Sequence, residues 1–209
     1  MKKRLCIFSN LVLFLEVNKH KVLEINDMVS WTHFLTLPVV LYLSYLLWKL
    51  IKDEAIFIPL PMKTVRRILR YANPSEKDIV YDLGCGDGRV VVIAAKHFGA
   101  RAKGIEIRHD LVEEAKQRAL KEGVQDKVEI IEGDIYSTPI RDATVVYMYL
   151  LTSVNEKLKP KLQSELKPGA RVVSLDFEIP GWHPIRKVFV WDGYRFRTVY
   201  FYVMGKSNR

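Results

Sequence analysis

The chain has 209 residues, a formal net charge of +9 and two cysteines. This length fits one domain with an extension, and 49% hydrophobic and 27% charged residues exclude a disordered chain. The cysteines, Cys6 and Cys85, are too few for a disulfide framework or a cysteine-based metal site. Because residues 1–54 contribute only +2, the rest of the chain is basic. Such a domain contacts nucleic acid, anionic lipid or an acidic protein, or its charge only keeps the surface soluble.

An uncharged hydrophobic run near the amino terminus predicts a membrane anchor. We expect a transmembrane helix over residues 31–51, because residues 34–48 contain no charged side chain. From Trp31 to Trp48 such a helix measures about 26 Å, close to the ~30 Å hydrocarbon core of a bilayer. The competing interpretation is a hydrophobic helix packed on the domain or on another subunit. We therefore divide the chain into an N-terminal extension, residues 1–54, and a globular domain, residues 55–209.

The orientation of this anchor depends on where the protein starts. With all residues kept, five Lys and Arg precede the span and the orientation is ambiguous. If Met28 is the true start, every nearby Lys and Arg follows the span. The positive-inside tendency then predicts a single-pass membrane protein with its globular domain on the cytosolic side.

From residue 62 onward the pattern alternates between helices and strands. We expect helices over residues 62–71, 87–98 and 110–121, and a helix broken by Pro160 that ends at Leu166. We expect strands from Ile79 and over residues 102–107, 128–134, 143–150, 170–177, 187–191 and 196–204. This order predicts an α/β fold: a Rossmann-like, doubly wound, mostly parallel seven-stranded sheet with a reversed C-terminal hairpin at its edge.

The glycine-rich segment after the first strand is the most informative motif. Gly84, Gly86 and Gly88 allow the backbone to turn sharply and to approach a ligand closely. A dinucleotide-binding G-x-G-x-x-G motif needs its third glycine at the position of Arg89, which disfavours a dehydrogenase. Asp82, two residues before the first glycine, repels a pyrophosphate but attracts an ammonium or sulfonium group. The motif therefore predicts a cationic, nucleoside-like cofactor.

Two further apolar runs also end in carboxylates. Glu106 lies eighteen residues beyond Gly88, at the place from which an acid binds ribose hydroxyls in Rossmann-type sheets. Asp134 ends the run that begins at Val128. Three strand-end carboxylates around one glycine turn suit an adenosine that carries a cationic amino acid.

These motifs resemble the class I S-adenosylmethionine-dependent methyltransferases. Residues 82–88 are similar to the first motif of that family, and residues 166–174 to its passage from a helix into the fifth strand. More narrowly, the chain is similar to the membrane-anchored protein-lysine methyltransferases, whose mitochondrial members act on a lysine of the ATP synthase c subunit or of the adenine nucleotide translocase. The similar segments fall within about residues 56–182, and they are residues 58–61, 81–89, 149–151 and 174–177.

The resemblance implies S-adenosyl-L-methionine as the cofactor and a set of residues that bind it. Asp82 is expected to hold the methionine amino group, Glu106 the ribose hydroxyls and Asp134 the adenine amino group, with Ile107 and Ile135 on either side of the ring. The expected cofactor-binding residues are Asp82, Gly84, Cys85, Gly86, Gly88, Glu106, Ile107, Asp134 and Ile135.

Two other residue types in the chain suggest different chemistry, which we disfavour. Cys85 is a candidate nucleophile by type, but no histidine lies near it in the sequence, so we interpret it as a small residue that fits a tight turn. His97, His109 and His183 show no metal-ligand spacing and are interpreted as surface or turn residues, so no metal is expected.

The acceptor side rests on Tyr149 and Asp176. Methyltransferases that act on DNA bases or glutamine often carry Asn-Pro-Pro-Tyr after the fourth strand, but residues 147–150 here are Tyr-Met-Tyr-Leu. A lysine must be neutral to attack, so its site should lower its pKa. Tyr149 could orient the amine, and Asp176 could position or deprotonate it. For each, a purely structural role is the alternative.

The sequence thus predicts a methyltransferase that modifies a lysine of a membrane-associated and, we expect, membrane-embedded protein, because an anchor raises the effective concentration of such a substrate. An RNA or small-molecule methyltransferase is the closest alternative, and the basic charge suits it. A membrane-tethered binding module without catalysis is a third interpretation, disfavoured by the intact cofactor motifs.

Overall fold

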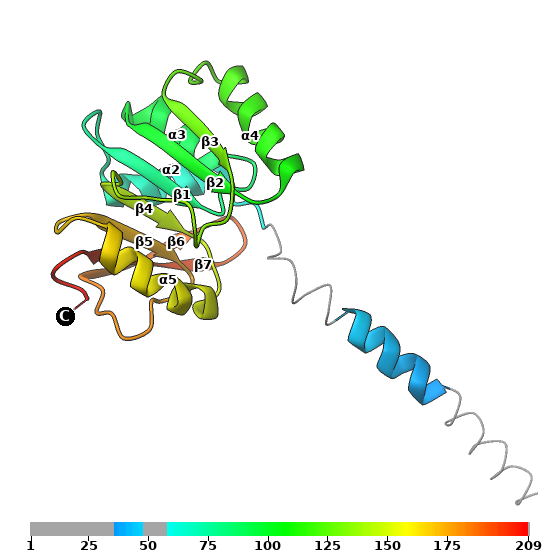
Figure 1. Ribbon diagram of the computed structural model, residues 1–209. Helices are drawn as coiled ribbons and strands as arrows, with labels where there is room; N and C mark the ends of the chain where they lie inside the picture. The colour runs from blue at the N-terminus through cyan, green and yellow to red at the C-terminus, as the bar shows by residue number, and fades with distance from the viewer. Residues whose placement is uncertain (1–35, 48–57, 209) are drawn as a thin grey trace, which may run out of the picture. The chain divides into compact units, whose positions relative to one another are not determined.

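The computed structural model describes residues 36–47 and 58–208. The chain divides into two compact units, Met1–Ile56 and Phe57–Arg209, which we describe separately. In the first unit, residues 36–47 form a helix with almost all of its side chains exposed (Figure 1). Within the described ranges, no helix is both long enough and apolar enough to cross a membrane. The anchor predicted over residues 31–51 lies partly outside those ranges.

The second unit contains one sheet of seven strands, in the order β3-β2-β1-β4-β5-β7-β6 (Figure 1). The strands are β1 Ile79–Leu83, β2 Arg101–Glu106, β3 Val128–Glu132, β4 Val145–Met148, β5 Arg171–Leu175, β6 Arg186–Trp191 and β7 Phe196–Val203. β1 to β5 pair in parallel, whereas β7 runs antiparallel to both β5 and β6. The predicted Rossmann-like sheet with a C-terminal hairpin is confirmed, and its reversed strand lies one position in from the edge.

Helices cover both faces of this sheet. They are α2 Met62–Ala72, α3 Arg89–Phe98, α4 His109–Lys121 and α5 Thr152–Glu165. Successive side chains of a strand point to opposite faces, and Val145 and Val146 of β4 accordingly enter two different core clusters. The cluster of Val145 includes residues of α2 and α3, whereas the cluster of Val146 includes Leu158 and Leu162 of α5. α5 therefore lies on the opposite face from α2 and α3.

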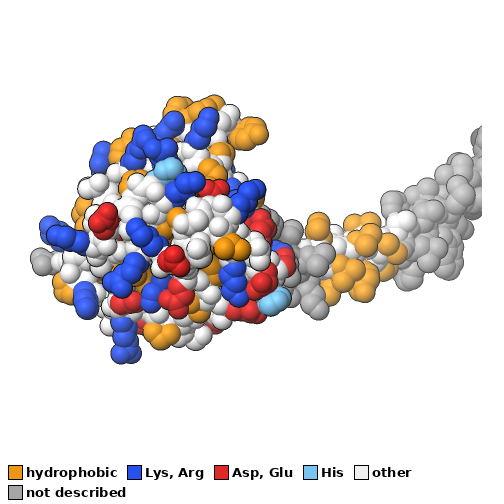
Figure 2. Space-filling view, turned by 90° about the horizontal axis from the view of Figure 1, so that it is seen from above, with side chains coloured by type: hydrophobic (Ala, Val, Ile, Leu, Met, Phe, Trp, Pro, Cys, Tyr) orange, Lys and Arg blue, Asp and Glu red, His pale blue; other side chains and the backbone are white. Residues whose placement is uncertain are grey.

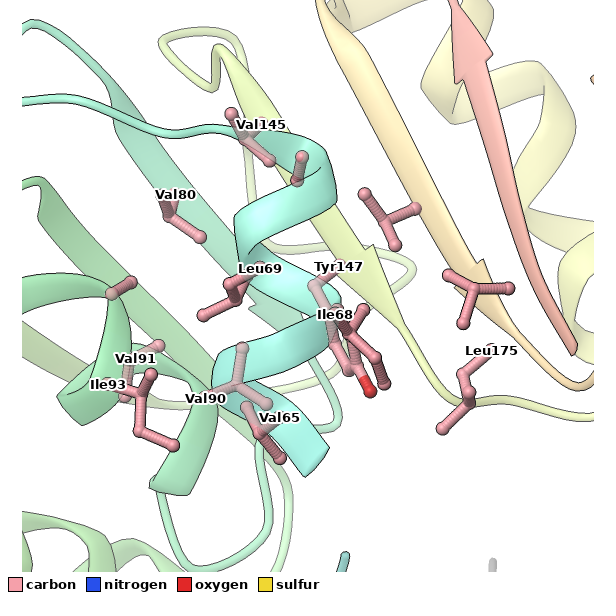
Figure 3. Close-up of a cluster of buried hydrophobic side chains, with 14 of the residues drawn as sticks. Val65, Ile68, Leu69, Val80, Val90, Val91, Ile93, Val145, Tyr147 and Leu175 are labelled. Carbon is pink, nitrogen blue, oxygen red and sulfur yellow. The ribbon is translucent and has the colours of Figure 1, made fainter. Parts of the chain in front are cut away.

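α2 packs into the same core cluster as Tyr147 of β4. Val65, Ile68 and Leu69 form one completely buried stripe of this helix. Figure 3 shows Ile68 beside Tyr147 of β4 and Val65 beside Val90 of α3. Burial of each such side chain contributes about 1.5–3 kcal/mol, so this stripe keeps α2 in the core cluster that includes Tyr147.

Most elements begin or end within one or two residues of the sequence-based expectation, and three differences are instructive. α3 begins at Arg89 rather than at residue 87, because Gly88 caps it in a left-handed conformation. β4 ends at Met148, which leaves Tyr149 in the following loop. α5 continues through Pro160, so the predicted break is wrong. The proline is exposed, and Leu158 and Leu162 on either side of it are buried in the core, so their packing keeps this stretch helical.

The hairpin of β6 and β7 leaves an aromatic surface uncovered. Residues 176–185 connect β5 to β6 without a helix. The register pairs Trp191 with Phe196 and Phe189 with Thr198, which places these side chains on one face. Phe189, Trp191 and Phe196 are 68%, 46% and 66% exposed, and we call them the aromatic face. On the side of the molecule seen in Figure 2, Lys and Arg are dispersed rather than gathered in one basic patch.

Candidate cofactor and acceptor site

The glycine turn lies across the carboxyl ends of β1 and β2. Gly84, Gly86 and Gly88 have φ values of +77°, +52° and +75°, in the left-handed region that favours glycine. The backbone N–H groups of Gly84 and Cys85 donate to the carbonyl of Ile105 at 2.9 and 3.0 Å. These bonds fix the turn to β2, so its backbone forms a floor at this edge of the sheet.

Gly88 also sets how closely α3 and α4 approach each other. A Cβ on Gly88 would lie 2.8 Å from the Cβ of Ala115 and 3.1 Å from its Cα. Real Cβ atoms essentially never show the first distance, and the second is tighter than nine in ten real Cβ contacts. Two independent constraints, the backbone dihedral and the helix contact, therefore require glycine here.

Asp82 is a buried carboxyl group among other acids. It is 3% exposed and belongs to β1. Burial raises its pKa well above the usual value, and the negative charges of Glu106 and Asp87 raise it further. A cationic group beside Asp82 would offset this repulsion. The environment of Asp82 therefore fits the amino or sulfonium end of a ligand and opposes a phosphate.

Glu106, at the end of β2, is held against the glycine turn. Its Oε2 accepts a hydrogen bond from the N–H of Gly86 at 2.9 Å, and its Oε1 accepts from the N–H groups of Ile107 and Arg108, each at 3.0 Å. The side chain is 8% exposed. A carboxylate oxygen can accept more than one hydrogen bond, so Glu106 is oriented yet still able to accept bonds from ligand hydroxyls.

The end of β3 brings Asp134 to the same edge. The N–H of Gly133 donates to the carbonyl of Glu106 at 2.9 Å, and Asp134 Oδ1 accepts from the N–H of Tyr136 at 2.9 Å. Ile107 is 69% exposed, whereas Ile135 is half-buried. The structure thus gathers the predicted acids and two apolar side chains beside one turn, in an arrangement that fits a nucleoside.

Cys85 fills space inside this turn. It is 4% exposed, and its Sγ lies 2.6 Å from where a Cβ on Gly104 would be. Burial raises the pKa of the thiol, and the charges of Asp82 and Glu106 raise it further. The thiol therefore stays protonated, which agrees with a small packing residue and not with a nucleophile.

An ion-pair network below the turn was missed by the sequence analysis. Asp87, 2% exposed, accepts hydrogen bonds from Arg89 Nε at 2.8 Å and from Arg118 Nη2 at 2.6 Å. Arg118 also donates to the Asp87 carbonyl, and Arg89 to the carbonyl of Leu60. Asp87 thus ties the turn to α3, to α4 and to the segment before α2. α4 contains several charged residues, and nothing in the sequence singles out Arg118 among them as the partner of Asp87.

Tyr149 and Asp176, the two predicted acceptor-side residues, are joined by a residue that the sequence analysis also missed. Arg197 Nη1 donates to the hydroxyl of Tyr149 at 2.8 Å and to Asp176 Oδ2 at 2.6 Å. Asp176 accepts a further bond from Arg195 at 3.0 Å. It has φ +59°, one of two positive values among the non-glycine residues described. The ring of Tyr149 stacks on Phe177 at 6.2 Å between centroids.

Tyr147 places a buried hydroxyl between the two groups of acids. It is 2% exposed, pairs with Asp82 in the register of β1 and β4, and its hydroxyl has no hydrogen-bond partner among the described residues. Burial raises its pKa well above the usual value, and so do the charges of Asp82 and Asp176. The hydroxyl (Figure 3) is therefore a neutral donor that lacks a partner within the described part of the protein.

The three histidines singled out in the sequence lie on the surface. His97, His109 and His183 are exposed, and His109 pairs with Glu132 through Nδ1 at 2.9 Å. Within residues 36–47 and 58–208, no group of three or more His, Cys, Asp or Glu side chains is placed to hold a metal ion.

Comparisons with known proteins agree with this geometry. A family model described as the ANTKMT methyltransferase domain matches residues 82–186. A protein-lysine N-methyltransferase of Saccharolobus islandicus is 51% identical over 73% of this chain and 95% of its own length. An adenine nucleotide translocase lysine N-methyltransferase of Mus musculus is 42% identical, over 51% of this chain and 47% of its own. The chain thus spans about half of that longer relative.

A solved structure extends the comparison to the cofactor. The RNA methyltransferase of Salinibacter ruber, in complex with S-adenosyl-L-homocysteine, is 47% identical and superposes with a TM-score of 0.66, covering 70% of this chain and 94% of its own. The acids and the glycine turn described above fit S-adenosyl-L-methionine, the methylated form of that ligand. The chain belongs to the family of S-adenosylmethionine-dependent protein-lysine methyltransferases that carry the ANTKMT methyltransferase domain.

Proposed function

We propose that this enzyme methylates a lysine side chain of a membrane-associated protein, at a site formed by the carboxyl ends of β1, β2, β4 and β5. The observation that carries the proposal is the contact of Tyr149 and Asp176 with a single arginine at that edge. Relatives named as lysine N-methyltransferases of the ATP synthase c subunit and of the adenine nucleotide translocase support a membrane substrate. The exposed, apolar helix of residues 36–47 supports membrane attachment, with the second unit on the cytosolic side.

In this proposal the cofactor-side residues bind and orient. Asp82 holds the amino group, Glu106 the ribose hydroxyls and Asp134 the adenine, between Ile107 and Ile135. Gly84, Gly86 and Gly88 let the backbone pass beneath, with Cys85 packed inside the turn. The bound cofactor supplies a methyl group on a sulfonium.

The acceptor-side residues position the amine. Methyl transfer is an in-line displacement, so alignment of the two reactants and exclusion of water provide most of the acceleration. The hydroxyl of Tyr149 orients the lysine nitrogen, and Asp176 fixes the arginine that contacts Tyr149. Neither needs to take part in a covalent step.

Labelling of cell fractions tests this proposal. The purified full-length protein is incubated with tritiated S-adenosylmethionine and with membranes, soluble proteins or RNA of the source cells, and Asp82→Asn serves as the inactive control. We expect label in a lysine of a membrane protein, identified by mass spectrometry and lost with the variant. Label in soluble proteins alone contradicts the membrane substrate.

RNA methylation is the second candidate, because the Salinibacter ruber relative is described as an RNA methyltransferase. The remaining charge of +7 outside residues 1–54 is compatible with it. Label in RNA alone, with none in protein, would replace lysine methylation by this function.

A further inference from the structure

Arg197 is the centre of a buried charge network at the acceptor end of the site. It lies in β7, is 9% exposed, and forms ion pairs with Asp176 at 2.6 Å and with Asp192 at 2.5 Å. Its guanidinium also lies 5.8 Å from the centre of the Tyr149 ring. One side chain thus contacts the loop after β4, the end of β5 and the turn of the hairpin through three groups.

The two carboxylates of this network are neutralised by two arginines. Arg195, 62% exposed, is the second partner of Asp176 at 3.0 Å. Backbone N–H groups of Arg195 and Tyr194 donate to Asp192 and lower its pKa to about 2. Burial lowers the pKa of Arg197, but its bonds to Asp192 and Asp176 outweigh burial and raise it. Two positive and two negative side chains therefore face one another, and their charges cancel.

This balance matters for an incoming lysine. An unpaired carboxylate within about 4–6 Å of an amine favours its protonated, unreactive form. Asp176 is linked to Tyr149 through Arg197, because Arg197 Nη1 donates both to the Tyr149 hydroxyl and to Asp176 Oδ2. The contact screens the amine from a charge that would otherwise keep it protonated.

We propose that Arg197 is a positioning residue that neutralises Asp176, so that the substrate lysine enters the site as a neutral amine. The inference rests on the proposed lysine methylation, and it identifies Arg197 as the residue that sets the charge at the acceptor side of the site. The fixed guanidinium holds the hydroxyl of Tyr149 in place by the same contact.

Charged and titratable groups from every neighbouring element contribute to this pocket. They are Asp82 of β1, Tyr147 of β4 with Tyr149 after it, Asp176 and Glu178 after β5, Tyr200 of β7, Asp192 and Arg195 of the hairpin turn, and Arg67 of α2, which donates to the carbonyl of Trp191. Of the two arginines on Asp176, only Arg197 is buried, so solvent screens its charge least.

The pH dependence of kcat tests the proposal, because it reports groups in the enzyme–substrate complex. The acceptor is the lysine protein found by the labelling experiment, at saturating concentration, with the full-length chain. For Arg197→Met we expect the acid limb to move to higher pH by about one unit. For Arg197→Lys, which keeps a cation, we expect the limb close to that of the wild type. Arg186→Met, which removes an exposed arginine from the same hairpin, is the matched control.

A double variant separates charge from structure. Removing both charges with Arg197→Met and Asp176→Asn should return the acid limb toward the wild-type position, even where the rate is lower. Thermal unfolding and calorimetric binding of S-adenosylmethionine show whether each variant is folded and loaded. If Arg197→Met lowers kcat by the same factor at every pH, the inference is wrong. If the wild type labels no lysine, the proposed function itself fails.

Discussion

Two glycines with similar dihedrals differ in their surroundings. Gly88 and Gly123 have φ values of +75° and +66°, but only Gly88 faces a close neighbour, Ala115, whereas nothing lies within 4 Å of a Cβ on Gly123. Gly123→Ala should therefore cost only backbone strain, about 1 kcal/mol. Gly88→Ala adds overpacking and should cost about 1–3 kcal/mol more. Urea unfolding measures both, and equal losses would contradict the helix contact.

Asp87 should stabilise the fold through its two arginines. Asp87→Asn removes charge-assisted bonds to Arg89 and Arg118, and we expect a loss of about 2 kcal/mol in the free energy of unfolding. Glu113→Gln, which breaks an exposed pair with Lys116, is the control and should cost less than about 1 kcal/mol. A similar loss in both variants would contradict a structural role for the buried network.

The Asp87 contribution should also depend on pH. Burial raises the pKa of Asp87, but hydrogen bonds and charge from Arg89 and Arg118 outweigh it and lower the pKa. Because the pKa is lower in the folded state, the carboxylate stabilises the fold at any pH above its pKa in the unfolded chain, about 3.9. This stabilisation is lost as the pH falls through the folded-state pKa. Between about pH 6 and about pH 3 the free energy of unfolding should therefore fall in the wild type, and it should fall less in Asp87→Asn. Parallel curves would contradict this.

At the scale of whole elements, each face of the hairpin of β6 and β7 carries residues whose proposed function can be tested. Its inner face carries Arg197, and its outer aromatic face lies uncovered at the same end of the sheet. Exposed aromatic side chains are typical of surfaces that bind other proteins, and these lie at the same end of the sheet as the proposed acceptor site.

Removal of aromatic side chains should therefore weaken substrate binding. For Trp191→Ala and Phe196→Ala we expect KM for the protein acceptor to rise about tenfold, which corresponds to about 1.4 kcal/mol, while the affinity for S-adenosylmethionine is unchanged. Leu120→Ala, at an exposed position of α4, is the control. An unchanged KM in both hairpin variants would exclude this surface from substrate binding.

The elements differ in how well the sequence predicts them. The glycine turn and the acids at strand ends follow from local patterns, because parallel strands bring their carboxyl ends to one edge. Asp82, Glu106 and Asp134 were predicted for this reason. Arg197 could not be predicted in this way. Its partners lie in the loop after β4, after β5 and in the hairpin turn, and the direction of its side chain depends on the register between β6 and β7. The break at Pro160 was wrong because tertiary packing outweighed the local preference.

At the scale of the whole molecule, the two units should separate by function. Removal of residues 1–54, at the domain boundary predicted from the sequence, should leave the unfolding temperature and cofactor affinity of the second unit unchanged. The same deletion should abolish sedimentation with membranes, because it removes the apolar helix of residues 36–47. Continued sedimentation of the shortened protein would contradict an N-terminal anchor.

The proposed function depends above all on lysine being the methylated group. The most direct measurement is the chemical identity of the labelled product after incubation of the full-length protein with tritiated S-adenosylmethionine and a total extract. Complete hydrolysis to amino acids and nucleosides separates the two candidate products. We predict radioactive methyl-lysine that is absent with Asp82→Asn. Label confined to methylated nucleosides would contradict the account.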